Sequence, residues 1–299
     1  MYVASHNIMD GLYINKLLRH YQELKDKAKD SPIFLCIQEN VIYNGKYSSD
    51  NGYIFGSTAD VISNCLSTEI PSVYKCVTST DTRLSTIYNT AMFELLESET
   101  LYLPKLEKLS ISNRVAGFKI EDKTSLVTRF KLKNPDKILS DTKENIACSN
   151  SSSGSGDLVF TIVNFHLDAA GDNKHRMMQF QKIADILHAK ESFVLCGDTN
   201  LFTFFPKSSK QYDLLNEMVE PIVAKSGGGI IGDCSQPTHF FSRANEPKLG
   251  HQVVYKLGKL GLDIPGCYDV LISNMVEDTV GQIDTPFSDH NLIYAKFNF

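Results

Sequence analysis

The side chains best suited to chemistry in this sequence are carboxylates, amides and imidazoles that stand at the ends of short apolar runs. These residues are Asn7; Gln38 and Glu39; Asn164 and His166; Asp198 and Asn200; Asp269; and Asp289 with His290. A buried strand that ends abruptly in a polar residue places that residue at one rim of a sheet. We therefore expect these endings to meet in a single cleft.

These residue types suit the hydrolysis of a phosphate ester. Carboxylate and amide oxygens are the ligands that a hard divalent cation prefers, and such a cation neutralises charge on a phosphoryl group. A carboxylate or an imidazole can orient and deprotonate the attacking water. Amide and imidazole donors can stabilise charge on the phosphoryl oxygens. A cluster rich in cysteine or histidine would instead indicate zinc or iron.

The elements that must position these residues are a mixture of strands and helices. Strands are predicted over the β-rich runs 2–7, 33–38, 85–95, 115–120, 126–132, 158–166, 193–197, 268–272 and 292–297. Helical spacing of apolar residues predicts helices over 15–28 and 174–189, and a weaker pattern predicts a third over 211–220. The regular β-α alternation of a parallel Rossmann sheet is missing, so the pattern predicts a mixed α/β fold.

The chain is predicted to form one domain over residues 1–299. Residues 134–157 are the one clear shift in composition, and they end in a run of Ser and Gly. Such a stretch cannot bury a core, and we expect a mobile surface loop. Apolar strands flank it closely on both sides. This favours a long hairpin connection inside one domain over a linker between two.

Composition is that of a soluble globular protein. Hydrophobic residues make up 42% and charged residues 22% of the 299 residues. No apolar run is long enough to span a membrane, and the N-terminus resembles no signal peptide. The seven cysteines form no C-x-x-C pair. We interpret them as reduced thiols of an intracellular protein, in the nucleus or the cytoplasm. The net charge of −5 argues against a broadly basic nucleic-acid binder but not against a nuclease.

The order of the polar motifs along the chain is more informative than any one of them. They are Ser5-His6-Asn7, Ile37-Gln38-Glu39, Asn164-Phe165-His166-Leu167, Gly197-Asp198-Thr199-Asn200, Tyr268-Asp269 and Ser288-Asp289-His290. This series resembles the ordered motifs of the endonuclease/exonuclease/phosphatase superfamily over nearly the whole chain. The resemblance implies an α/β fold, the DNase I-like four-layer α-β-β-α sandwich of two mixed sheets.

The resemblance also implies a metal site and its surroundings. Glu39 would be the principal Mg²⁺ ligand, and Mn²⁺ can substitute for Mg²⁺ in such a site. Asn7 and Asp289 would complete or support the metal site. His166 would add a contact to the phosphate. Arg176, on the predicted helix that follows, resembles a family arginine near the site and would bind phosphate as well.

The remaining roles implied by the resemblance concern the reaction itself. Asp198 would orient or activate the nucleophilic water, and Asn200 would hold the phosphate or the nucleophile. His290 would contact the scissile phosphate and stabilise the transition state. Asp269 would accept a hydrogen bond from His290 and fix its tautomer, as carboxylate partners of histidine generally do.

The sequence departs from the family pattern in its aromatic residues. The family usually has Trp in the first motif, where this chain has His6, and Trp is also common where this chain has His239. The side chain before Asn7 points to the opposite face of the strand, so His6 is expected to affect packing more than catalysis. Within the superfamily, residues 7–12 and 197–201 resemble the 5′-tyrosyl-DNA phosphodiesterases. Met9 is inserted relative to that pattern, and Phe202-Thr203 replaces the expected Arg-Asp.

The function predicted from the sequence is Mg²⁺-dependent hydrolysis of phosphodiester bonds, with nucleic acid, DNA or RNA, as the substrate. Within that class a 5′-tyrosyl-DNA phosphodiesterase, as in DNA repair, and a general nuclease are both open. The alternatives are a phosphoinositide or sphingomyelin phosphoesterase, and a catalytically inactive binding module on the same fold. The intact set of polar motif residues argues against the inactive module.

Overall fold

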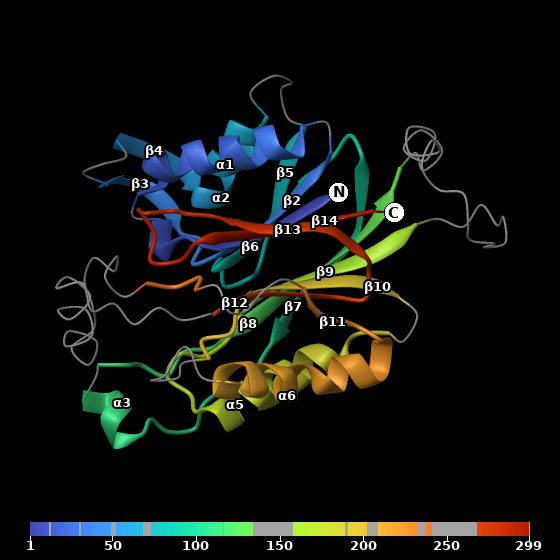
Figure 1. Ribbon diagram of the computed structural model, residues 1–299. Coiled ribbons are helices and arrows are strands. Elements are labelled where there is room, and N and C mark those ends of the chain that lie inside the picture. The colour runs from blue at the N-terminus through green and yellow to red at the C-terminus, as the bar shows by residue number, and fades with distance from the viewer. Residues whose placement is uncertain are drawn as a thin grey trace, which may run out of the picture.

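The computed structural model of the protein shows two β-sheets stacked between two layers of helices (Figure 1). It describes residues 1–11, 13–29, 31–48, 52–67, 73–115, 117–133, 158–188, 191–201, 209–231, 237–240 and 268–298. The predicted loop over 134–157 lies outside these residues. Within the described part, no helix is both long and apolar enough to cross a membrane.

The two large sheets have six strands each and contain both parallel and antiparallel pairs. The first has the order β13 (Glu277–Ile283), β14 (Leu292–Phe297), β1 (Tyr2–Asn7), β2 (Ile33–Gln38), β6 (Leu84–Asn89), β5 (Tyr74–Thr78). The second has the order β11 (Gly229–Ile231), β12 (Asp269–Ser273), β10 (Ser192–Asp198), β9 (Val159–His166), β8 (Thr124–Leu132), β7 (Phe93–Tyr102). A small hairpin of β3 (Ile42–Ser48) and β4 (Gly52–Ser57) stands apart.

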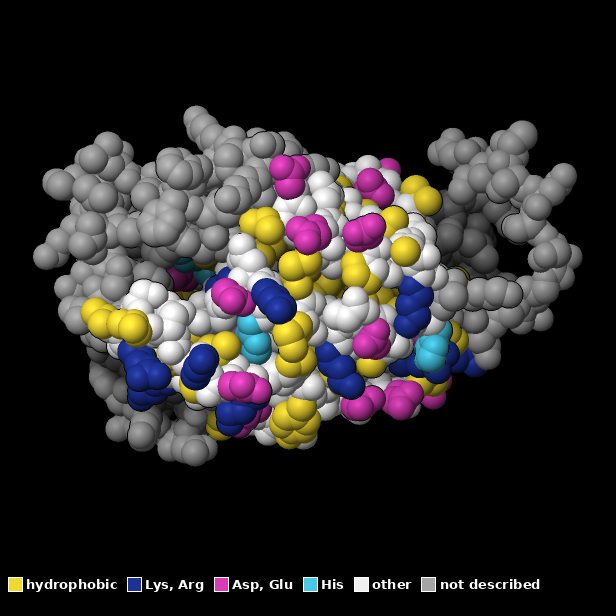
Figure 2. All heavy atoms as spheres, turned by 90° about the horizontal axis from the view of Figure 1, so that it is seen from below, with side chains coloured by type: hydrophobic (Ala, Val, Ile, Leu, Met, Phe, Trp, Pro, Cys, Tyr) yellow, Lys and Arg dark blue, Asp and Glu magenta, His cyan; other side chains and the backbone are white. Residues whose placement is uncertain are grey.

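Helices cover the outer face of each sheet (Figure 1). Helices α1 (Ile14–Ala28) and α2 (Thr58–Leu66) lie over the first sheet, and α5 (Asn173–Asp185) and α6 (Ser209–Ser226) lie over the second. Two short helical turns, η1 (Met9–Gly11) and α3 (Ile111–Val115), complete the described elements. On the face that carries α5 and α6, acidic and basic side chains are interspersed (Figure 2). The four-layer sandwich predicted from the family resemblance is confirmed.

Strand β2 shows how the sequence builds the layers. Its residues alternate between two cores, because successive side chains of a strand point to opposite faces. Leu35 and Ile37 pack in the core beneath α1 and α2, whereas Phe34 and Cys36 pack in the core between the two sheets. Both faces of β2 are therefore buried, which explains why the segment reads as an uninterrupted apolar run.

Two predicted strands are wrong. Residues 85–95 form the end of β6 and the start of β7, which lie in different sheets. The chain turns between them where the Asn89 side chain accepts hydrogen bonds from the backbone N–H groups of Ala91 and Met92. The described residues of 115–120 form no strand. Val115 and Ile120 are exposed, and Phe118 is only partly buried.

The other predicted elements occur with shifted ends. The second helix ends at Asp185 instead of reaching 189, and the third extends over Ser209–Ser226. Strands β8 and β9, on either side of residues 134–157, pair antiparallel as neighbours, as a hairpin connection requires. The sequence reading missed α2, β5, β13 and the β3–β4 hairpin. The four described cysteines, Cys36, Cys65, Cys76 and Cys196, are free thiols.

Candidate active site

The predicted site residues gather where strands of both sheets end on the same side of the sandwich. Asn7 is the last residue of β1, and Glu39 directly follows β2, which runs parallel to β1. In the second sheet, Asp198 ends β10 and stands between His166 of β9 and Asp269 of β12 in the strand register. Parallel neighbours end at the same edge of a sheet, and the antiparallel β12 begins at that edge with Asp269, so the register brings together the side chains within each sheet.

The side chain of Asn7 joins the two halves of the site. Its Nδ2 donates to Glu39 Oε1 at 3.3 Å and to Asp198 Oδ2 at 3.1 Å. Its Oδ1 accepts the backbone N–H of Met9 at 3.1 Å, which fixes the amide orientation. One amide therefore bridges a carboxylate of the first sheet and a carboxylate of the second.

Glu39 has an unusual backbone conformation that directs its carboxylate into the site. Its φ is 59°, in the left-handed region that non-glycine residues rarely occupy. In this conformation Glu39 Oε2 accepts the backbone N–H of Asp10 at 3.0 Å while Oε1 faces Asn7. Strained residues of this kind are concentrated at functional sites, where surrounding contacts hold them in place.

His290 is held from one side by a buried carboxylate. Its Nδ1 lies 2.8 Å from Asp269 Oδ2, and its Nε2 lies 3.7 Å from Asp198 Oδ2. Burial alone would lower the pKa of His290, but the charges of Asp269, Asp198 and Asp289 raise it to about 10. His290 is accordingly an imidazolium that points Nε2 toward Asp198.

Asp198 is the centre of the arrangement and is almost completely buried. Its Oδ1 accepts the backbone N–H of Asn200 at 2.7 Å, and its Oδ2 lies 3.6 Å from His166 Nε2. Burial and the neighbouring Asp269 raise the pKa of Asp198 despite the opposing charge of His290. The Asn200 side chain is turned to the loop after β9, where its Nδ2 donates to the Leu167 carbonyl at 3.0 Å.

Arg176 supports the rim of the site from α5. Its guanidinium is buried and donates to the backbone carbonyls of Asp168 and Ala169, both at 3.0 Å, and to the Asn173 side chain at 3.1 Å. These bonds tie the loop after β9 to the start of the helix. The role of Arg176 in binding phosphate stays a prediction, because the described bonds go to that loop and to Asn173 at the start of α5.

Several solved structures share the architecture of this chain at low sequence identity. An endonuclease/exonuclease/phosphatase from Bacteroides vulgatus matches with a TM-score of 0.55 at 17% identity, over 98% of this chain and 97% of that one. TDP2 of D. rerio, complexed with a single-strand DNA product, matches with a TM-score of 0.56 at 12% identity, over 100% and 99%. The inositol polyphosphate 5-phosphatase domain of SPsynaptojanin, in complex with inositol (1,4)-bisphosphate and calcium, matches with a TM-score of 0.59 at 14% identity, over 98% and 82%.

This chain has the endonuclease/exonuclease/phosphatase fold. The resemblance inferred from the ordered motifs is thereby confirmed at the level of the fold. No protein-family model matches the sequence, and no curated protein matches it.

At the candidate site of this endonuclease/exonuclease/phosphatase fold, carboxylates are more numerous than positively charged side chains. The carboxylates are those of Glu39, Asp198, Asp269 and Asp289, and they surround His290. Burial and the charges of Asp10 and Asp289 raise the pKa of Glu39 to about 7. Burial would also raise the pKa of Asp289, but His239 and His290 lower it to about 2. Asp289 Oδ1 is buried without a hydrogen-bond partner among the described residues. An acidic, oxygen-rich cluster with an unsatisfied carboxylate oxygen fits a hard divalent cation such as Mg²⁺.

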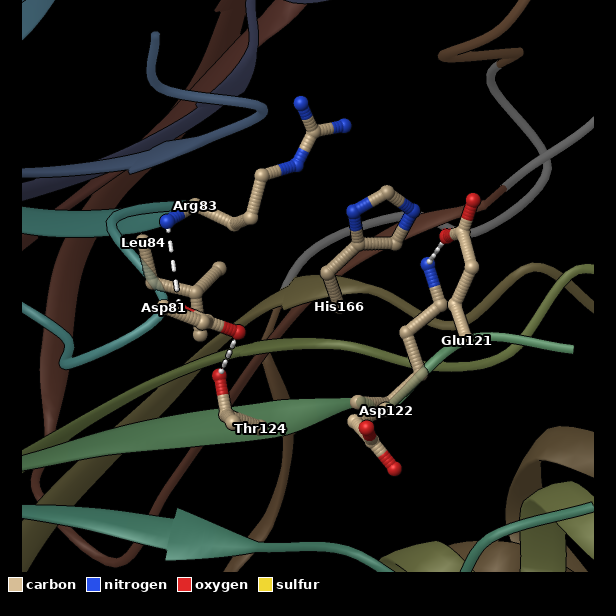
Figure 3. Close-up of a pocket in the computed structure, with 8 residues that line it drawn as sticks. Asp81, Arg83, Leu84, Glu121, Asp122, Thr124 and His166 are labelled. Carbon is tan, nitrogen blue, oxygen red and sulfur yellow. Dashed lines mark hydrogen bonds and ion pairs between the residues drawn. The ribbon is translucent and has the colours of Figure 1, made fainter. Parts of the chain in front are cut away.

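A small pocket with mostly polar lining residues lies beside His166, one of the site residues (Figure 3). It is lined by Asp81, Arg83, Leu84, Glu121, Asp122, Lys123, Thr124 and His166. Arg83 pairs with Asp10 at 2.7 Å, and Lys123 pairs with Glu121 at 3.0 Å. Both cations of the pocket are thus already neutralised by carboxylates, which makes it a polar surface instead of a strongly basic one.

Two features of the site were missed from the sequence. Gln38 Nε2 donates to Asn164 Oδ1 at 2.7 Å, and Asn164 Nδ2 donates to the backbone carbonyls of Ile37 and Ser85, both at 3.0 Å. This buried network joins the two sheets directly beneath the site. His239, noted only as a replacement for a family Trp, lies against Asp289 and His290. The position of Gln38 and Asn164 at strand ends could have indicated their hydrogen bond. The sequence around His239 has no pattern that indicates its contact with Asp289 and His290.

Proposed function

We propose that this protein is a Mg²⁺-dependent phosphodiesterase that acts on nucleic acid, with Mn²⁺ able to replace Mg²⁺. The observation that carries the proposal is the set of groups around one oxygen. Asp198 Oδ2 has Asn7 Nδ2, His166 Nε2 and His290 Nε2 within 3.7 Å, and Asn7 also contacts Glu39. A water and a phosphate placed there would meet a base, several donors and a metal-binding carboxylate together.

In this mechanism each residue has a separate task. Asp198, fixed by the Asn200 backbone N–H, orients the attacking water and accepts its proton. His290, held by Asp269, donates from Nε2 to a phosphoryl oxygen as charge builds up on it. His166 adds a second donor, because its Nε2 lies 3.6 Å from the same Asp198 Oδ2.

Glu39 and Asp289, with Asn7 beside them, are the residues that would hold the metal. A bound Mg²⁺ would supply positive charge for the phosphoryl oxygens and the leaving group. Asn7 fixes the position of the Glu39 carboxylate relative to that of Asp198, because its amide nitrogen donates to both carboxylates. A loss of this amide should therefore weaken both halves of the site.

Two observations support nucleic acid as the substrate. The chain shares its fold over its full length with TDP2, whose structure holds a single-strand DNA product. The motifs at residues 7–12 and 197–201 resemble those of the 5′-tyrosyl-DNA phosphodiesterases. The face over α5 and α6 mixes both signs of charge (Figure 2), so we place the substrate at the strand ends that carry the site and not on that face.

A small phosphorylated polyol is the second candidate substrate. The pocket beside His166 favours it, since the carboxylates that line the pocket can accept hydrogen bonds from the hydroxyl groups of a polyol. The likeness in fold to an inositol polyphosphate 5-phosphatase domain points the same way.

A metal-dependent screen tests the proposal. The purified protein is assayed with Mg²⁺, with Mn²⁺ and with EDTA on 5′-tyrosyl DNA, abasic duplex, single-stranded DNA, oligo(A), an inositol polyphosphate and sphingomyelin. We expect phosphodiester hydrolysis of a nucleic acid that EDTA abolishes. Glu39→Ala, Asp198→Ala and His290→Ala should each lower turnover by about 10²–10⁴-fold, whereas Glu23→Ala on the exposed face of α1 should not. Full activity of a folded Asp198→Ala protein would refute the role of Asp198.

A further inference from the structure

His239 is held against the Asp289–His290 motif by a short backbone ladder. The N–H of Phe240 donates to the carbonyl of Asp289 at 2.7 Å, and the N–H of Asn291 donates to the carbonyl of Thr238 at 2.7 Å. His239 and His290 form the bridge between these two bonds. The position of His239 therefore follows from backbone pairing and does not depend on a chance side-chain contact.

The side chains of His239, Asp289 and His290 converge; the two histidines are buried and Asp289 is partly buried. His239 Nε2 lies 3.7 Å from Asp289 Oδ2, and the His239 ring meets the His290 ring edge-on with centroids 4.6 Å apart. On its other side His239 stacks on Tyr268 with centroids 4.5 Å apart. One ligand atom from each of His239, Asp289 and His290 lies within 4.8 Å of the other two.

These spacings suit ligands of one metal ion better than hydrogen-bond partners. A distance of 3.7 Å exceeds the range of a hydrogen bond. Two ligand atoms at roughly 2.0–2.2 Å from a tetrahedral ion are about 3.3–3.6 Å apart, so an inward shift of the three ligand atoms, which now lie within 4.8 Å of one another, would complete the site. The contact of His290 Nδ1 with Asp269 leaves Nε2 as the coordinating atom, as in the carboxylate–histidine–metal arrangement of many metal sites.

The donor set selects a different class of metal from the site around Glu39. Glu39 and Asn7 offer oxygen donors, which suit Mg²⁺. Two imidazole nitrogens and one carboxylate oxygen suit the later first-row metals, because imidazole is a borderline ligand that Mg²⁺ binds poorly. We propose that His239, Asp289 and His290 form a second, transition-metal site that takes Zn²⁺ or Co²⁺.

Occupancy of this site would inhibit the enzyme. This step rests on the proposed function, in which His290 Nε2 donates to the phosphate. A metal ion on that nitrogen removes the donor, and a metal ion on Asp289 takes a carboxylate from the Mg²⁺ site. His239 thereby makes hydrolysis sensitive to Zn²⁺ in the presence of excess Mg²⁺.

Visible absorption of Co²⁺ tests the site without any assay of activity. With excess Mg²⁺ present, Co²⁺ is titrated into the wild-type protein, His239→Phe and His239→Gln, and the d–d bands of the bound ion are recorded. We expect the wild-type protein to bind one Co²⁺ through nitrogen ligands, and both variants to bind it at least about tenfold more weakly. His188→Ala, which removes an exposed imidazole from the end of the α5 segment, is the control and should bind as the wild type does. Circular dichroism verifies that each variant is folded. If His239→Phe does not fold, the comparison with the wild type is made with His239→Gln alone.

The outcomes separate this inference from the proposed function. Co²⁺ bands of equal strength and affinity in wild type and folded His239→Gln overturn the metal site, whatever the activity. If Mg²⁺ supports hydrolysis, micromolar Zn²⁺ should inhibit the wild type at least tenfold more strongly than His239→Gln, each measured against its own rate with Mg²⁺ alone. Equal inhibition overturns the inhibitory role. The lack of any hydrolysis refutes the proposed function but leaves the Co²⁺ result to decide the site.

Discussion

The carboxylate of Glu39 is expected to destabilise the metal-free protein. The folded protein raises its pKa from 4.5 to about 7 through burial and the nearby charges of Asp10 and Asp289. Between these two values the folded state binds more protons than the unfolded chain, so stability decreases as the pH rises from about 4.5 to about 7. Each pKa unit corresponds to about 1.4 kcal/mol, so the ionised side chain costs roughly 3 kcal/mol at pH 8 at most.

Glu39→Gln removes this charge at nearly constant shape. The amide cannot accept both of the present hydrogen bonds, from Asn7 and from the Asp10 backbone, and a lost bond costs about 1 kcal/mol. We therefore expect the variant to be about 1–2 kcal/mol more stable than the wild type at pH 8 in EDTA. At pH 4 both proteins lack the charge, so the gain should disappear there.

Urea denaturation in EDTA at pH 4, 6 and 8 measures this difference. Glu23→Gln, which removes a carboxylate from the exposed face of α1, is the matched control and should shift stability by less than about 0.5 kcal/mol at any pH. Saturating Mg²⁺ should reverse the order, since a ligand at 100 times its Kd stabilises the protein that binds it by about 2.7 kcal/mol. A Glu39→Gln protein that is less stable than the wild type at pH 8, or a difference that does not vary with pH, would show that the site is not short of positive charge.

Three further substitutions test the parts that surround the site. Gly197 has φ 154°, and a Cβ there would lie 1.9 Å from the Phe165 carbonyl oxygen. Gly197→Ala should therefore lower the free energy of unfolding, measured by urea denaturation, by more than about 2 kcal/mol. An unchanged midpoint of the urea transition would contradict this. Burial lowers the pKa of His6 to about 3, so the folded protein loses stability as the pH falls from about 6.5 toward 3. His6→Phe should therefore reduce the loss of stability between pH 7 and pH 5 by up to about 2 kcal/mol. An equal loss in the wild type and the variant would count against this prediction. Asp269→Asn should lower the pKa of His290, measured by NMR, and reduce turnover about 100-fold; an unshifted pKa would show that Asp198 alone sustains the imidazolium.

The strand ends could be predicted because the signal for them is local. Strands β1, β2, β9 and β10 are buried on both faces and stop abruptly at a polar residue, so an apolar run followed by Asn, Glu, His or Asp locates both the strand and the rim of its sheet. Residues from both sheets then meet because neighbouring parallel strands end together. The family resemblance supplied the stacking of the two sheets, which no local pattern contains.

The features that the sequence did not reveal depend on distant contacts. Nothing in residues 85–95 shows that the chain leaves one sheet and enters the other, because both halves have strand-like composition. His239 contacts Asp289, some fifty residues away in the sequence, because their backbones pair. Backbone hydrogen bonds do not depend on residue type, so the sequence gives no sign of this contact. The run at 115–120 has the composition of a strand, but among the described residues it pairs with no strand and exposes Val115 and Ile120, so its propensity alone does not decide its structure.

The site is also the place where the two sheets are joined by polar contacts. Elsewhere the layer between the sheets is apolar, with Phe34 packed edge-on against Phe130 and Phe160. At the site this layer gives way to the Gln38–Asn164 hydrogen bond and then to the Asn7–Asp198 hydrogen bond. Apolar packing tolerates small sliding of one sheet over the other, whereas directional hydrogen bonds do not. The buried amides therefore fix the separation between Glu39 and Asp198. In the proposed reaction a metal-bound phosphate and its attacking water would lie between these two carboxylates, so we infer that the polar network serves the geometry of the site as well as the stability of the fold.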